Sequence, residues 1–106
     1  MVIIESIVFT RLIKELMSDD EYRELQESLI QKPDAGALMK ASGGLRKVRW
    51  KLQGKGKSSG IRVIYYWVVD ANQLRMLYVY PKGKQDNLTA QQLQTLKTVI
   101  VRWSDG

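Results

Sequence analysis

Residues 61–69, Ile-Arg-Val-Ile-Tyr-Tyr-Trp-Val-Val, decide the fold, because they carry the strongest strand signal in the chain. The stretch is almost continuously apolar, as expected of a central strand that is buried on both faces. A turn at Asp70-Ala71-Asn72-Gln73 leads into a second strand over residues 74–80, which Pro81 ends. Residues 45–52 predict a further strand before the central one. The sequence therefore predicts an antiparallel meander of three strands with 61–69 in the middle.

Further strand and helix signals flank this meander. Residues 2–8 predict a first strand, and residues 9–17 carry apolar side chains at helical spacing. Ser18-Asp19-Asp20-Glu21 is a capping box that opens a second helix, and Lys32-Pro33 ends it. A second capping box, Thr89-Ala90-Gln91-Gln92, opens a last helix. The order β-α-α-β-β-β-α defines one small α+β domain over all 106 residues, with a helical hairpin packed on a mostly antiparallel, twisted sheet.

The charge is distributed unevenly along the chain, which has a net charge of +6. Residues 1–34 hold four basic and eight acidic side chains, whereas residues 35–106 hold thirteen basic and three acidic ones. No acidic residue occurs between Asp34 and Asp70. A basic surface of this kind attracts polyanions. The sequence therefore predicts an RNA-binding lobe between residues 40 and 84; the alternative is a solvated surface that keeps the protein soluble.

Cysteine and histidine are both absent from the sequence. Their absence excludes a disulfide framework and thiolate metal sites, and removes the commonest general base and metal ligand. We therefore expect neither a cofactor nor a metal. The chain has no apolar run of about 18 residues and no leader of the secretory kind, so we expect no membrane span and a cytoplasmic location.

Five cations flank the last two strands of the meander. They are Lys55, Lys57, Arg62, Lys82 and Lys84. Two lie in the loop before the central strand, one near the start of that strand, and two directly after the next strand. Because antiparallel neighbours place the start of one strand beside the end of the other, we expect the five to meet at one end of the sheet. Such a cluster suits a phosphodiester, and more so the charge that develops at a pentacoordinate phosphorus.

The chemistry open to this cluster is cleavage of RNA by its own 2′-hydroxyl. That reaction needs a base for the hydroxyl proton, a group that holds the phosphate, and an acid for the leaving 5′-oxygen. Arginine stays charged and binds phosphate bidentately. Tyr66, Tyr80 and Trp50 are candidates to stack on unpaired bases.

Each of these features also has an ordinary explanation. Lys55 and Lys57 suit the solvated tip of a hairpin, and Arg62 suits an ion pair with Asp86. The aromatic side chains of the strands suit the core. The residues alone therefore leave binding, catalysis and plain structure open.

Four blocks of sequence resemble the HigB-like branch of the RelE toxin superfamily. They are Ser42-Gly43-Gly44-Leu45-Arg46-Lys47-Val48-Arg49, Lys55-Gly56-Lys57-Ser58-Ser59-Gly60-Ile61-Arg62-Val63-Ile64-Tyr65-Tyr66, Tyr80-Pro81-Lys82-Gly83-Lys84 and Asp86-Asn87-Leu88-Thr89. The blocks follow the order of that family. The resemblance implies a RelE-like fold and the toxin of a type II toxin–antitoxin pair. Such toxins are metal-independent, ribosome-dependent endoribonucleases that cut translated mRNA in the A site.

The resemblance also implies roles for particular residues. The implied catalytic set is Arg62, Lys55, Lys57, Lys82 and Lys84, and the expected RNA contacts are Arg46, Lys47, Arg49, Tyr66 and Tyr80. The implied partners are the 70S ribosome with its mRNA and a HigA-like antitoxin with a helix-turn-helix domain. Relatives often add a tyrosine or histidine near the last helix; this chain has no histidine, so the general base stays open.

Two other functions fit the same scaffold. ParE-like relatives inhibit DNA gyrase and typically lack the catalytic cations, which argues against that function here. A non-catalytic RNA-binding module would need only the basic surface. Growth arrest with intact DNA and broken mRNA is the outcome that separates the nuclease from both.

Overall fold

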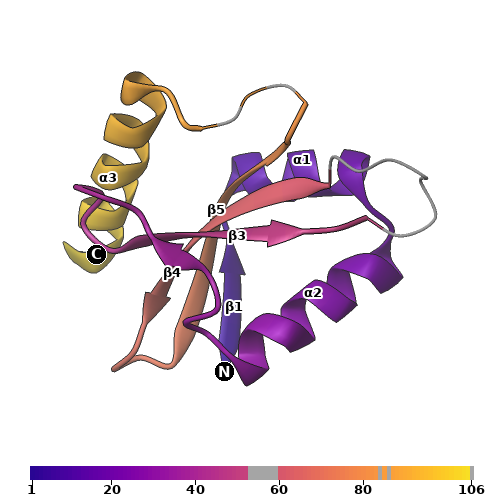
Figure 1. Ribbon diagram of the computed structural model, residues 1–106. Coiled ribbons are helices and arrows are strands. Elements are labelled where there is room, and N and C mark those ends of the chain that lie inside the picture. Colours follow the sequence, from indigo (N-terminus) through magenta and orange to yellow (C-terminus); the bar gives the residue numbers. More distant parts are fainter. Residues whose placement is uncertain (53–59, 84, 86, 106) are drawn as a thin grey trace.

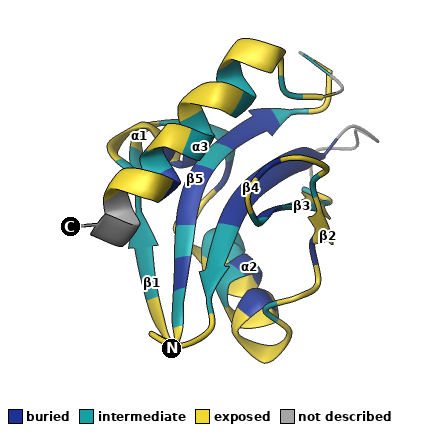
Figure 2. Cartoon of the chain, turned by 90° about the vertical axis from the view of Figure 1, so that its left-hand side faces the viewer, coloured by how far each residue is buried: buried dark blue, intermediate teal, exposed yellow. Residues whose placement is uncertain are grey.

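The computed structural model describes residues 1–52, 60–83, 85 and 87–105, so Lys55, Lys57, Lys84 and Asp86 lie outside the described residues. The elements, in chain order, are β1 (Val2–Glu5), α1 (Ile7–Leu16), α2 (Asp19–Gln31), β2 (Ala37–Leu38), β3 (Leu45–Trp50), β4 (Ile61–Val68), β5 (Gln73–Pro81) and α3 (Ala90–Asp105). One five-stranded sheet has the order β1-β5-β4-β3-β2; Figure 1 shows how the helices lie around it, and Figure 2 labels every strand. Among the strands in the described residues, only β1 and β5 pair in parallel. The predicted α+β class, with a central β4 in an antiparallel meander, is confirmed.

Serine caps set the starts of the first two helices. The Ser6 hydroxyl accepts the N–H of Phe9 at 3.0 Å, so α1 begins two residues earlier than predicted and β1 is shorter than predicted. The β-branched residues after Ser6 favoured a longer strand, but the cap overrides that local preference. The predicted capping box of α2 is confirmed, since the Glu21 N–H donates to the Ser18 hydroxyl and the Glu21 carboxylate accepts the Ser18 N–H.

The sheet separates two apolar clusters. Helices α1 and α2 cover one face, where Phe9 and Leu25 pack against inward side chains of β4 and β5. Helix α3 covers part of the other face, and its Ile100 packs against Ile64 and Leu45. Strand β4 is buried on both faces over most of its length (Figure 2), as its apolar sequence predicts. The face of the sheet that carries α3 is called the α3 face below.

A β-bulge in β5 changes which side chains reach the α3 face. Ile64 pairs with Tyr78, but the next residue of β4, Tyr65, pairs with Met76, so Leu77 is the extra residue. Met76 belongs to the cluster under α1 and α2, whereas Leu77 and Tyr78 belong to the cluster under α3. The bulge therefore directs consecutive side chains of β5 to the α3 face.

The connector between α2 and β3 contains a two-residue strand that the sequence did not predict. This strand, β2, pairs with β3 at the edge of the sheet. The buried Tyr65 hydroxyl donates to the Pro33 carbonyl at 2.6 Å and accepts the Gly36 N–H at 2.9 Å. The Arg46 guanidinium donates to the Gly36 carbonyl at 2.8 Å. Side chains of the sheet thus fix the path of the connector. In the described part of the chain, no helix has the length and apolarity to cross a bilayer.

Candidate functional site

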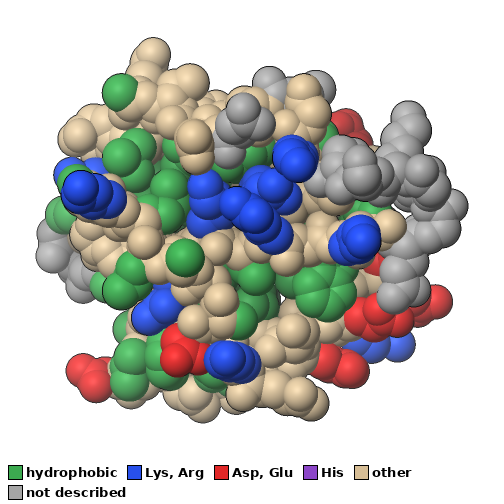
Figure 3. Space-filling view, in the orientation of Figure 1, with side chains coloured by type: hydrophobic (Ala, Val, Ile, Leu, Met, Phe, Trp, Pro, Cys, Tyr) green, Lys and Arg blue, Asp and Glu red, His purple; other side chains and the backbone are tan. Residues whose placement is uncertain are grey.

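A row of cationic and aromatic side chains crosses three strands on the α3 face. Arg49 of β3 lies opposite Arg62 of β4, and Arg62 lies opposite Tyr80 of β5. Directly opposed residues have Cβ atoms about 4.5–5.5 Å apart, so these three side chains are neighbours. We call them the Arg62 row. In the view of Figure 3, Lys and Arg side chains gather over the part of the sheet formed by β3 and β4.

Arg62 is the buried member of this row. Its side chain is 8% exposed, and its Nη1 donates a long hydrogen bond of 3.4 Å to the Ile61 carbonyl. Among the residues that the structure describes, no carboxylate forms a salt bridge with it. A buried guanidinium without a counterion is costly, and the exposed Arg49 opposite adds like charge. The arrangement favours the binding of an anion.

Two lysines lie near the Arg62 row. Lys47 is two residues from Arg49 on the same face of β3, and its ammonium donates to the Asn87 side chain at 3.0 Å. The backbone N–H of Lys82 donates to the Gly60 carbonyl at 3.3 Å, which places the end of β5 beside the start of β4. The structure thus brings Lys82 and Arg62 to the same end of the sheet, as the antiparallel order of the two strands predicts.

Two of the predicted RNA contacts lie elsewhere. Arg46 points to the opposite face of β3 from Arg49 and is bonded to carbonyls of the connector. Tyr66 lies four residues beyond Arg62 on β4, about 13 Å along the strand. Its ring lies over Gly44, where an added Cβ would come within 2.7 Å of it. Neither side chain joins the Arg62 row.

The two tyrosines of β5 form a pair beside Arg62. The Tyr78 and Tyr80 ring centroids are 5.8 Å apart with a tilt of 36°. Tyr80 is only 2% exposed, whereas Tyr78 is half-buried and therefore the more accessible ring. Tyr78 was not among the site residues predicted from the sequence, although it lies two residues from Tyr80 on the same strand, and strand alternation would place both on one face.

The chemistry of this arrangement is electrostatic. Two guanidinium groups side by side can hold the non-bridging oxygens of one phosphate and stabilise added negative charge there. In the ranges that the structure covers, no group of three or more Asp, Glu, His or Cys side chains is placed to hold a metal ion. The site as described is a cationic surface next to aromatic rings.

Comparison with solved structures identifies the fold. No protein-family model matches the sequence. The intact E. coli RelBE toxin–antitoxin complex matches with a TM-score of 0.56 and 16% identity, over 74% of this chain and 92% of that one. The isolated E. coli RelE toxin matches with a TM-score of 0.57 and 14% identity, over 92% and 97%. A double arginine-to-alanine variant of RelE in the free state matches with a TM-score of 0.52 and 15% identity, over 80% and 86%.

These matches show to which class of fold the chain belongs. The chain has a small α+β architecture, with helices on both faces of an open, mostly antiparallel sheet. The particular protein whose fold it shares is the E. coli toxin RelE. At 14–16% identity the likeness concerns the fold alone.

Proposed function

We propose that this protein is the toxin of a type II toxin–antitoxin pair and that it is a ribosome-dependent endoribonuclease. The observation that carries the proposal is Arg62, an arginine that is 8% exposed, opposite a second arginine and beside a tyrosine pair. The fold shared with the RelE toxin supports the same function. A buried charge of this kind lowers the stability of the free protein, but it favours the binding of an anion.

The proposed reaction is cleavage of translated mRNA in the ribosomal A site. The 2′-oxygen attacks the adjacent phosphorus, the bond to the 5′-oxygen breaks, and the products carry a 2′,3′-cyclic phosphate and a 5′-hydroxyl. Arg62 and Arg49 hold the phosphate and stabilise its added charge. Lys82, together with Lys55, Lys57 and Lys84, which lie outside the described residues, adds positive charge around the phosphate. These lysines are also the candidates to take the proton of the 2′-hydroxyl and to protonate the leaving 5′-oxygen. No metal ion takes part in the proposed reaction.

The proposed partners follow from the resemblance of the sequence to the HigB-like branch. The ribosome would position the mRNA, so the purified protein alone should cut naked RNA poorly. The antitoxin would be HigA-like, with a helix-turn-helix domain, and both proteins would act in the cytoplasm. The RelBE toxin–antitoxin complex among the matching structures supports a protein partner of this kind.

The test is cleavage of a reporter mRNA in a reconstituted bacterial translation system. Removal of an electrostatic stabiliser of this kind should lower the rate about 10²–10³-fold, which we expect of Arg62→Ala. Arg23→Ala is the matched control, because it removes the same charge from an exposed position on α2. Equal rates for wild type and Arg62→Ala would contradict the site. Intact mRNA together with gyrase inhibition would favour the ParE-like function.

A further inference from the structure

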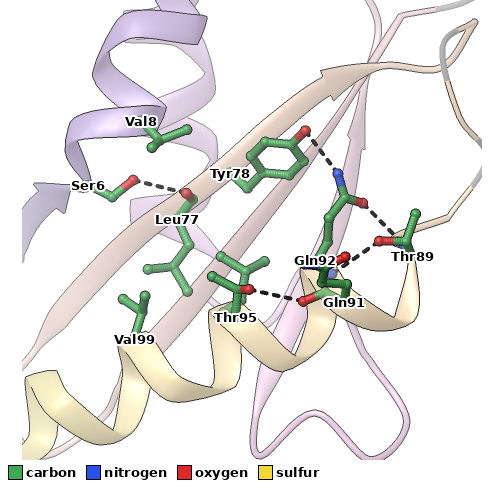
Figure 4. Close-up of a pocket in the computed structure, with 10 residues that line it drawn as sticks. Ser6, Val8, Leu77, Tyr78, Thr89, Gln91, Gln92, Thr95 and Val99 are labelled. Carbon is green, nitrogen blue, oxygen red and sulfur yellow. Dashed lines mark hydrogen bonds between the residues drawn. The ribbon is translucent and has the colours of Figure 1, made fainter.

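A cavity of about 510 Å³ lies beside the Arg62 row, between α3, β5 and the start of α1 (Figure 4). Sites for small molecules typically have volumes of about 300–1,000 Å³. Its apolar lining comes from Val8, Leu77, Leu96 and Val99. None of its lining residues is charged. The cavity therefore suits a flat, uncharged group and not a phosphate.

Tyr78 links the cavity to the Arg62 row. This tyrosine lines the cavity, and its ring contacts that of Tyr80, which lies opposite Arg62. Tyr78 and Tyr80 are two residues apart on one strand, which is about 7 Å. A nucleotide whose phosphate rests on Arg62 would thus have a neighbouring base within reach of the cavity.

Hydrogen bonds fix the orientation of the Gln92 amide at the rim of the cavity. Its oxygen accepts the Thr89 N–H and one N–H of Gln85, both at 2.9 Å. Its nitrogen donates to the Tyr78 hydroxyl at 3.3 Å (Figure 4). Among the described residues, the hydroxyl proton of Tyr78 and the second amide hydrogen of Gln92 have no acceptor. Two adjacent donors are therefore available to a ligand.

We propose that this cavity binds a base of the RNA substrate, and that Tyr78 and Gln92 select a base edge with two hydrogen-bond acceptors. The O6/N7 edge of guanine is such an edge. The apolar wall would cover the face of the base, as protein side chains do with unpaired bases in RNA. This inference rests on the proposed function and adds a specificity site to it.

The test is the cleavage profile over an mRNA library in the same translation system, read from the 5′ ends of the fragments. Gln92→Glu keeps the capping box, since glutamate serves at that position, but it replaces the amide donor with an acceptor. Tyr78→Phe removes only the hydroxyl. Gln94→Glu is the matched control, because it adds the same charge at an exposed position on α3 outside the cavity.

We expect Gln92→Glu and Tyr78→Phe to reduce cutting next to guanine about tenfold relative to other sites, whereas Gln94→Glu keeps the wild-type profile. If Gln92→Glu does not fold, as judged by thermal melting, Tyr78→Phe decides the outcome. A wild type that cuts, with variants that keep its profile, would overturn the base-binding cavity alone. A wild type that makes no cut in translated mRNA would overturn the cavity and the proposed function together.

Discussion

Replacement of Arg62 by methionine should stabilise the protein and lower its rate of mRNA cleavage about 10²–10³-fold. Methionine has a length similar to that of the arginine stem and can pack beside Ile64 on the α3 face. The substitution removes the guanidinium that we assign to the phosphate. It also removes a buried charge that has no counterion among the described residues.

The size of the stability change follows from the surroundings of Arg62. The side chain is 8% exposed, and within the described part of the chain its hydrogen bond is the one of 3.4 Å to the Ile61 carbonyl, at the long limit for such bonds. Like charges directly opposite each other on a sheet cost about 0.2–1 kcal/mol, and Arg49 is in that position. Replacement of buried charges by apolar residues of similar volume is neutral or stabilising by about 1–4 kcal/mol. We expect a gain of about 1–2 kcal/mol, which raises Tm by roughly 5–15 °C.

The assay is urea unfolding followed by tryptophan fluorescence, with mRNA cleavage measured on the same preparations. Arg23→Met is the control, because its exposed site on α2 should change neither property. A loss of more than about 1 kcal/mol for Arg62→Met would show that Arg62 is part of an ion pair, since one-sided removal of a buried ion pair is strongly destabilising. Asp86 would then be the candidate partner, and Arg62 would have a structural role.

Three further predictions concern stability. Tyr65→Phe removes one buried and one partly buried hydrogen bond to the connector and should lower the free energy of unfolding by about 1–3 kcal/mol in urea titrations; an unchanged midpoint would mean that the connector is held otherwise. Gly60→Ala should cost at least about 1 kcal/mol, because φ is +57° and the new Cβ would lie 2.6 Å from the Trp50 carbonyl; thermal melting at the wild-type Tm would contradict this. Burial, and then the hydrogen bond to Glu5, raises the pKa of Tyr22 well above its usual 10.0, so stability should fall as pH rises above 10. Tyr22→Phe should flatten that fall, and an equal slope in both proteins would exclude Tyr22 as its cause.

Local signals predicted most of the fold. The apolar run at residues 61–69 identified the central strand, because burial on both faces leaves no polar alternation. The capping box at Thr89 is confirmed, since the Gln92 N–H donates to the Thr89 hydroxyl and the Gln92 side chain accepts the Thr89 N–H. The start of α1 was predicted wrongly because strand propensity was weighed above the cap at Ser6.

The site could be predicted in part, because some of it depends on topology and some on longer-range packing. The order of the strands is enough to bring Lys82 beside the start of β4. The bulge at Leu77 depends on pairing with β4, and no local signal for it was found. That bulge places both Leu77 and Tyr78 on the α3 face. The bond from Arg46 to the connector depends on β2, whose two exposed residues gave no strand signal.

Whether the protein cuts translated mRNA through Arg62 can be tested with a map of mRNA 5′ ends after a short induction of the protein in growing bacteria. We expect growth arrest with cuts confined to translated regions, with 5′-hydroxyl ends, and the loss of both with Arg62→Ala. Arrest with intact mRNA and broken DNA, or the same cuts with Arg62→Ala, would contradict this expectation.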